Sequence, residues 1–162
     1  METAVKPIKR SKELAPLSRE HHQGLLFVWK IRQGISNKVA PNRIASFCQW
    51  FWVHHLHDHF KKEEQEFIEV MPAEHPLLAK MLEEHTEIRN KIQAIEEYCD
   101  YDRLYRLAQV INYHIRFEER CLFKYIECLA TKEQLLSIED HSATEQLAAP
   151  VWIDEFWMIS KN

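Results

Sequence analysis

Glycine is almost absent from this chain, which contains two glycines and six prolines among 162 residues. A β-sandwich or β-barrel needs glycine-rich turns about every ten residues, and this sequence does not supply them. Between its breaks, apolar residues recur at intervals of three or four positions, as they do along one face of a helix. The sequence therefore predicts an all-α protein.

Breaks in the apolar pattern divide the chain into helices. We expect four long helices and a short fifth helix, at residues 18–36, 41–70, 76–99, 102–129 and 131–141. Because short connections make neighbouring helices antiparallel, the expected fold is an up-down-up-down four-helix bundle. The bundle should cover about residues 14–130 of a single domain, residues 1–162, and a C-terminal extension should follow at residues 131–162.

The C-terminal extension begins with Thr131 and Gln134, whose spacing matches a capping box. It ends in the apolar stretch VWIDEFWMI, which holds two tryptophans and a phenylalanine. Exposing such an apolar segment to solvent is unfavourable. We expect it to pack on the bundle or on a second subunit, so a homo-oligomer formed through the tail is one predicted partnership.

The segments HFKKEEQEF and HIRFEERCLF share the order histidine, three residues, then two glutamates. In both, the histidine and the first glutamate fall on the apolar stripe that their helix should bury. These pairs are His59 with Glu63 and His114 with Glu118. Residues four apart on a helix lie one turn apart on one face, with about 6 Å between their Cβ atoms. One metal ion can therefore bind both members of a pair.

Histidines interrupt the apolar stripes of the other two long helices as well. His85 is in register with the apolar residues of its helix, and the first helix supplies either His21 or His22. His21 fits the apolar register of the first helix better than His22 does. One inward histidine is more often a hydrogen-bonded core residue than a ligand, but the joint pattern on four helices points to a metal site.

Four imidazoles and two carboxylates would thus converge inside the bundle. Buried ionised carboxylates are unfavourable without a partner, and divalent cations are the usual partner. Six ligands are more than one tetrahedral zinc ion uses, whereas two octahedral irons can share them if each glutamate bridges both. The sequence therefore predicts two iron ions, with zinc as the less favoured occupant.

These segments resemble the hemerythrin-like family of HHE cation-binding domains. SREHHQGLL resembles the first-helix histidine motif of that family, HFKKEEQEF the second-helix motif, HPLLAKMLEEHTEIR the third and HIRFEERCLF the fourth. The resemblance implies a non-haem diiron centre that binds or reacts with oxygen, in proteins of oxygen carriage, sensing, iron homeostasis or repair of iron centres. Carried over by position, it assigns the metal ligands to His22, His59, Glu63, His85, His114 and Glu118.

The sequence departs from the oxygen carriers of that family at two positions. The carriers have another histidine on the third helix at HxxxH spacing, where this chain has Arg89, and an aspartate where it has Glu119. His55 lies one turn before His59 on nearly the same face. It is either an additional ligand or a residue outside the ligand set. His21, His55 and Glu119 therefore remain alternative metal ligands.

We expect a protein that binds or senses a small ligand such as oxygen or nitric oxide, or that acts in iron handling. The alternatives are a diiron oxidase or peroxide-consuming enzyme, and a structural interaction module stabilised by metal. A binding or sensing role is expected over an enzymatic one.

Charge and hydropathy limit the expected partners and location. A formal net charge of −4 offers no basis for nucleic acid binding. No stretch approaches the roughly eighteen consecutive apolar residues of a membrane span. The first residues lack the apolar run of a secretory signal, so a cytoplasmic location is expected.

Overall fold

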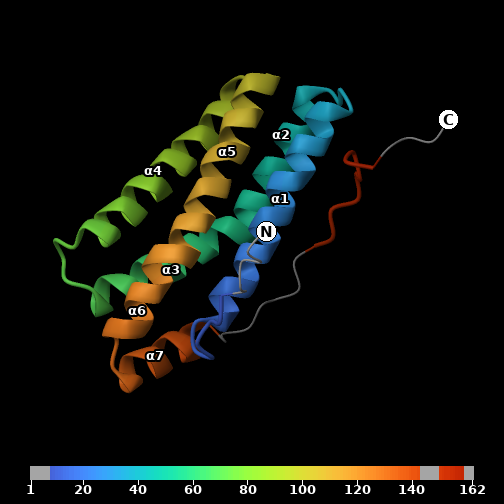
Figure 1. Cartoon of the computed structure of the whole chain (residues 1–162). Coiled ribbons are helices and arrows are strands. Elements are labelled where there is room, and N and C mark those ends of the chain that lie inside the picture. The colour runs from blue at the N-terminus through green and yellow to red at the C-terminus, as the bar shows by residue number, and fades with distance from the viewer. Residues whose placement is uncertain (1–7, 143–149, 159–162) are drawn as a thin grey trace, which may run out of the picture.

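The computed structural model describes residues 8–142 and 150–158 of the chain (Figure 1). These residues contain helices and no strand, as the sequence predicts. The elements are α1 (Ala15–Ser36), α2 (Pro41–Phe51), η1 (Trp52–Leu56), α3 (His57–Val70), α4 (Pro76–Glu97), α5 (Tyr101–Phe117), η2 (Glu118–Leu122), α6 (Phe123–Leu129) and α7 (Lys132–Ser142).

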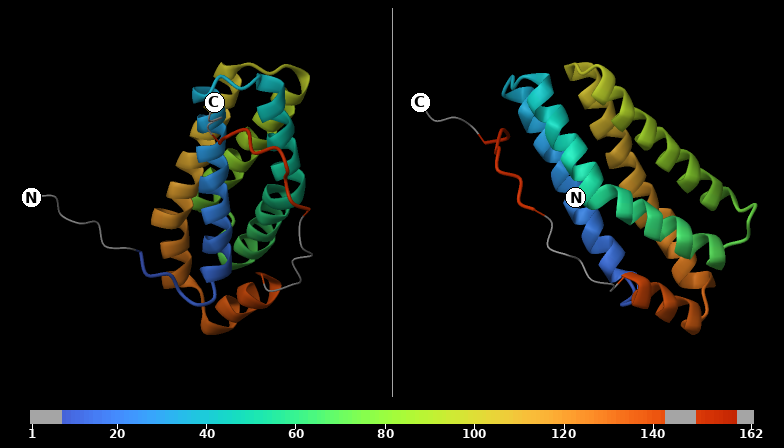
Figure 2. Two further views of the ribbon diagram at one scale, coloured as in Figure 1. Left: turned by 90° about the vertical axis from the view of Figure 1, so that its right-hand side faces the viewer. Right: turned by 180° about the vertical axis from the view of Figure 1, so that it is seen from behind.

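Two of the long rods each contain a π-helical turn. α2, η1 and α3 form one continuous rod, and α5, η2 and α6 form another. Together with α1 and α4 they lie side by side as a helical bundle (Figures 1 and 2). In Figure 1 the connections at residues 37–40 and 98–100 lie at the upper end of the bundle, and residues 71–75 lie towards the other end. π-helical turns are frequent at functional sites.

Several helix ends differ from the expected ones by a few residues. α1 begins at Ala15 rather than at residue 18, because Pro16 is well tolerated in a first helical turn. α5 begins at Tyr101, and the Asp100 side chain caps it by accepting a hydrogen bond from Arg103 N at 2.8 Å. The capping box at the start of α7 is confirmed, since Thr131 and Gln134 exchange backbone-to-side-chain hydrogen bonds of 2.9 and 3.2 Å.

Two apolar clusters fill the bundle. The tail-side core includes Phe27, Val28, Ile31, Phe47, Phe51, Phe60, Ile88, Ile92, Leu107, Ile111, Ile115 and Phe156. The α7-side core comprises Leu14, Leu17, Phe67, Met71, Leu78, Met81, Leu122, Phe123, Ile126 and Ile138. Along α1, His21 stands between Leu17 of one core and Phe27 of the other, and the other three rods repeat this order. A polar layer therefore separates the two cores.

The C-terminal segment packs on the bundle over its described residues 150–158. Phe156 is 4% exposed and its ring lies against Gly34, where a Cβ atom would come within 2.8 Å of it. Arg43 pairs with Asp154 at 2.6 Å, and Lys30 Nζ lies 4.2 Å from the centre of the Trp157 ring. Figure 2 shows this segment running beside α1 and α2. The sequence left two positions open for the tail, on the bundle or on a second subunit. The described residues of the tail lie on the bundle.

No helix among the described residues combines the length and the apolar character that a bilayer crossing requires.

Candidate metal centre

The polar layer consists of four histidines and two glutamates that are almost completely buried. They are His21 on α1, His59 and Glu63 on α3, His85 on α4, His114 on α5 and Glu118 on η2. None is more than 4% exposed. Each of the four rods thus contributes to one layer, as the interrupted stripes predict.

The six side chains form two overlapping groups. One group is His21, His59, Glu63 and Glu118, and the other is Glu63, His85, His114 and Glu118. Within each group, one potential ligand atom from every residue lies within 4.8 Å of the others. Both glutamates belong to both groups, which is the arrangement of two neighbouring cation sites that share two carboxylates.

The Nε2 atoms of the histidines face the shared carboxylates. His59 Nε2 lies 3.1 Å and His85 Nε2 3.4 Å from Glu63 Oε1. His21 Nε2 lies 3.8 Å from one oxygen of each glutamate, and His114 Nε2 contacts Glu118 Oε1. Nitrogen and oxygen lone pairs therefore point into a common space from four helices.

None of these inward atoms makes a hydrogen bond to the described part of the chain. The set comprises the four Nε2 atoms and both carboxylate oxygens of Glu63 and Glu118. Buried polar atoms almost always have a partner, and leaving eight without one would be strongly destabilising. Cations in the two groups would satisfy all eight atoms, so the residues fit a metal pair.

The outer nitrogen of every one of the four imidazoles meets a glutamate. The Nδ1–carboxylate distances are 2.6 Å for His21 with Glu119, 2.5 Å for His59 with Glu20, 3.3 Å for His85 with Glu64 and 2.8 Å for His114 with Glu84. A carboxylate that accepts the Nδ1 hydrogen keeps Nε2 pointing inward, where it can bind a cation in place of a proton. The four rings are thereby oriented with their ligand atoms inward.

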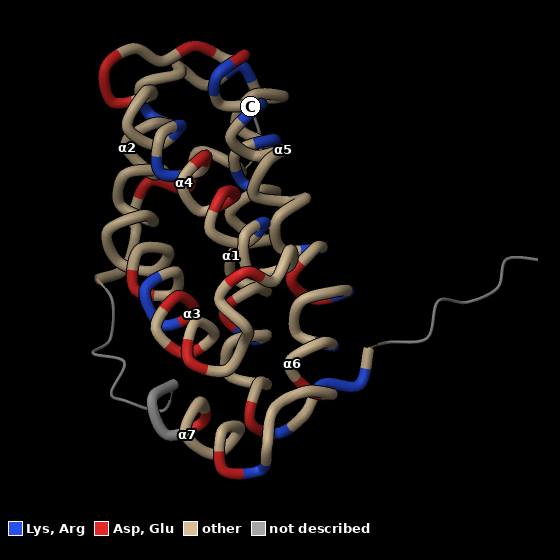
Figure 3. Tube along the Cα trace, turned by 90° about the vertical axis from the view of Figure 1, so that its left-hand side faces the viewer, with Lys and Arg blue, Asp and Glu red and all other residues tan. Residues whose placement is uncertain are grey.

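These outer glutamates are in turn held by basic or hydroxyl groups. Arg89 donates two hydrogen bonds of 2.8 Å to Glu64. Glu119 accepts from Ser18 Oγ at 2.5 Å and from Arg10 at 3.0 Å. Lys62 lies 3.3 Å from Glu20, and Lys80 lies 3.1 Å from Glu84. Figure 3 shows acidic and basic residues interleaved along the rods.

The local charges shift the pKa values of the cluster in opposite directions. Burial by itself would lower the pKa of an imidazolium, but the carboxylates of Glu63 and Glu20 raise the pKa of His59 to about 10. The glutamates around His85 likewise outweigh its burial and raise its pKa to about 11. Burial would raise the pKa of Glu118, but His114 and its other partners hold it well below its usual range. The carboxylates thus favour positive charge on the groups beside them.

Aromatic rings close the layer on both sides. The Phe60 ring stacks on His85 with centroids 3.8 Å apart, and the Phe123 ring stacks on His21 with centroids 5.0 Å apart. Both phenylalanines are almost completely buried. They exclude water from the imidazole faces and restrict rotation of the rings.

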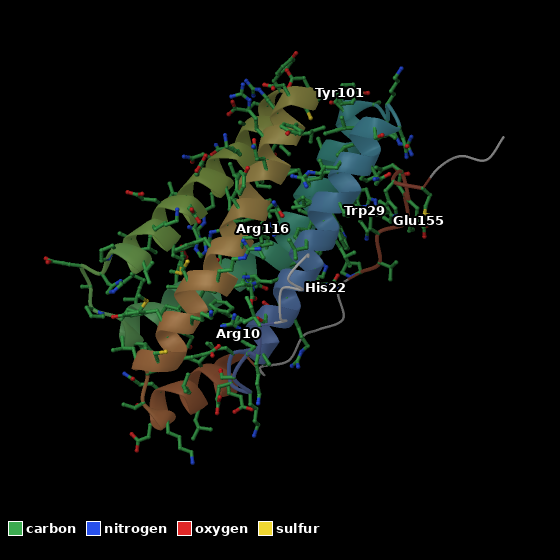
Figure 4. The ribbon with its side chains drawn as sticks, viewed as in Figure 1. Arg10, His22, Trp29, Tyr101, Arg116 and Glu155 are labelled. Atoms are coloured by element: carbon green, nitrogen blue, oxygen red, sulfur yellow. The ribbon has the colours of Figure 1, made fainter. Side chains whose placement is uncertain are left out.

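The structure places His22 outside the buried cluster and His21 within it. The buried positions of α1 include Leu17, His21, Gly24 and Val28, which recur at helical intervals. His22 is one position further around the helix and is exposed, and Figure 4 labels it on α1. His21 takes the place in the cluster that the motif resemblance assigned to His22.

The other two alternative ligands lie outside both groups. Glu119 contacts the outer nitrogen of His21 and is absent from the inner cluster. His55 is half-buried, with its ring 5.3 Å from Trp50 and 5.1 Å from Phe51. Five of the six residues first assigned as ligands therefore meet in the layer, and His21 completes it.

Sequence reasoning did not identify three of the outer glutamates. Glu20 and Glu84 directly precede His21 and His85 in the chain, and Glu64 directly follows Glu63. The recurring Glu-His and Glu-Glu pairs are the sequence pattern that could have indicated these glutamates. Their partners are on other helices, so the pairing required the tertiary structure.

A comparison with known families gives an independent result. The family model described as the hemerythrin HHE cation binding domain matches residues 12–126. No curated protein and no solved structure matches the chain. The matched range contains all six residues of the polar layer, whose two His/Glu groups fit a metal site. The chain therefore belongs to the hemerythrin HHE cation-binding domain family.

Proposed function

We propose that the polar layer holds two iron ions, which share Glu63 and Glu118. His21 and His59 would bind one ion, and His85 and His114 the other. Imidazole and carboxylate together suit iron, and the two shared carboxylates give each ion four protein ligands. An octahedral ion would then keep positions for a small ligand. The eight inward atoms without hydrogen bonds carry this proposal.

The function that this arrangement supports best is binding or sensing of a small ligand such as oxygen or nitric oxide, or a role in iron handling. An iron pair supplies redox and small-ligand chemistry when it is bound. The chain itself holds the imidazoles in one tautomer through the outer glutamates and keeps the ring faces dry through Phe60 and Phe123.

One observation favours the enzymatic alternative, a diiron oxidase or peroxide-consuming enzyme. All four imidazoles donate to carboxylates, and such partners raise the basicity of a metal-binding histidine. More basic ligands stabilise the higher oxidation state of iron. Sustained oxidation of a reductant with added oxygen or peroxide would support turnover, whereas stoichiometric uptake of the ligand would support a carrier or sensor.

Metal analysis tests the proposed centre directly. Protein from iron-supplemented cells should contain about two irons per chain, as two octahedral sites require. His59→Ala and His114→Ala should lose iron, whereas the control His54→Ala should retain it, because His54 is exposed and outside both groups. Folded variants of His59 and His114 with unchanged iron content would overturn the assignment. Zinc in place of iron, without visible absorption, would favour a structural metal.

A further inference from the structure

A cavity of about 1020 Å³ opens between α1, the α2–η1–α3 rod and the C-terminal segment. Its lining includes His21, His59 and His114 of the polar layer at one end. Small-molecule sites usually have volumes of about 300–1,000 Å³. A diatomic ligand needs far less, of the order of the ~30 Å³ that one water occupies in the liquid. A diatomic ligand therefore does not account for the size of this cavity.

Aromatic side chains form the walls away from the metal ligands. The rings of Trp50 and Trp152 have centroids 5.7 Å apart, and Phe47 lies 5.6 Å from Trp152. Trp157 also lines the cavity, and Lys30 Nζ lies over its ring. Rings arranged in this way offer faces and edges to a flat aromatic ligand.

His55 is one of the polar residues beside this aromatic surface, together with Lys30 and His54. It lies between Trp50 and Phe51 and lines the cavity. Its burial, and then the neighbouring His54, lower the pKa of His55, which favours the neutral ring. A neutral imidazole has one donor and one acceptor nitrogen and can accept the hydrogen of a hydroxyl group.

We propose that this cavity binds a planar aromatic molecule with a hydroxyl group, of the phenol or naphthol class. Trp50 and Trp152, whose ring planes are tilted by 49°, contact the ring through a face and an edge, and His55 accepts a hydrogen bond from the hydroxyl. This deepens the proposed function by adding an organic ligand class to the same site. The proposal rests on the proposed function only in that a metal pair would lie where His21, His59 and His114 line the cavity.

Calorimetric titration of 2-naphthol into the zinc-loaded full chain tests the site, since zinc is redox-inert. We expect saturable binding of one 2-naphthol per chain. Trp50→Leu should weaken it about tenfold, the effect of losing one stacking wall and its apolar contact. The matched control is Trp29→Leu on α1, because Trp29 is 48% exposed and outside the cavity lining. It should leave the affinity unchanged.

His55→Phe provides a second variant that preserves an aromatic ring of similar size. It should weaken binding of 2-naphthol while leaving binding of naphthalene unchanged. Absence of saturable binding, or equal losses in Trp50→Leu and Trp29→Leu, would overturn the proposal. The titration is repeated on the metal-free chain, where binding of 2-naphthol is read without any metal, so failure of the iron centre and failure of this site are distinguishable.

Discussion

The carboxylate of Glu119 lies 2.6 Å from Nδ1 of His21, on the side of the imidazole that faces away from the buried cluster of histidines and glutamates. Glu64 has the same relation to His85, at 3.3 Å. Each is the second glutamate of a segment whose first glutamate, Glu118 or Glu63, lies inside the cluster. Consecutive helical residues point in different directions, so one Glu-Glu pair supplies both an inner and an outer carboxylate.

Glu119→Gln should lower metal affinity without unfolding the protein. The amide keeps the size of the side chain but removes the charge that holds His21, and such partners are typically worth about 10–100-fold in affinity. Competition with a chelator of known affinity measures the change. The control is Glu87→Gln, whose side chain is 54% exposed and belongs to neither group. Equal affinities for both variants would contradict the role of Glu119.

Removal of metal should lower thermal stability. The metal-free chain leaves eight inward nitrogen and oxygen atoms without hydrogen bonds. A ligand present at 100 times its dissociation constant stabilises the folded state by about 2.7 kcal/mol per site. Calorimetric melting before and after chelation should show a lower Tm in the chelated sample. An unchanged Tm would argue against a metal-stabilised interior.

Gly34→Ala should loosen the C-terminal segment. The new Cβ would lie 2.8 Å from the Phe156 ring and 2.9 Å from Ile44 Cδ1, and a packed ring cannot yield easily. Tryptophan fluorescence should shift to longer wavelength as Trp152 and Trp157 become exposed.

Gly24→Ala serves as the matched control for this substitution. Its Cβ would meet Ile115 Cδ1 at 2.7 Å, the movable end of a side chain. Alanine also gains about 1 kcal/mol of helix propensity over glycine. This variant should therefore retain the fluorescence of the parent chain. A parent-like spectrum for Gly34→Ala would contradict the proposed packing of Phe156.

Acid should weaken the attachment of the C-terminal segment. The hydrogen bond from Arg43 lowers the pKa of Asp154 below its ordinary value of 3.8. Because the pKa of Asp154 is lower in the folded chain than in the unfolded chain, the ion pair stabilises the folded state fully at pH values above the unfolded-state pKa. This stabilisation is lost as the pH falls through the folded-state pKa of Asp154. Asp154→Asn should abolish this step in a tryptophan fluorescence titration, so the difference between the two titrations isolates it. Identical titration curves would contradict it.

The sequence by itself determined the helical class and most of the polar layer. The regular spacing of apolar residues defines one buried face per helix, so a histidine or glutamate on that face must lie inside whichever neighbours cover it. His59, Glu63, His85, His114 and Glu118 could be placed from this spacing alone. Scarcity of glycine excluded sheet-rich alternatives.

Only the tertiary structure decided between His21 and His22, because the apolar register of the helix favoured His21 whereas the family motif favoured His22. It also decided which glutamate meets which imidazole, since the partners of Glu20, Glu64, Glu84 and Glu119 lie on other helices. The aromatic cavity has the same origin, since its walls come from segments far apart in the chain. Periodicity reports the direction of a side chain from its own helix axis, whereas contacts between helices depend on how the helices pack.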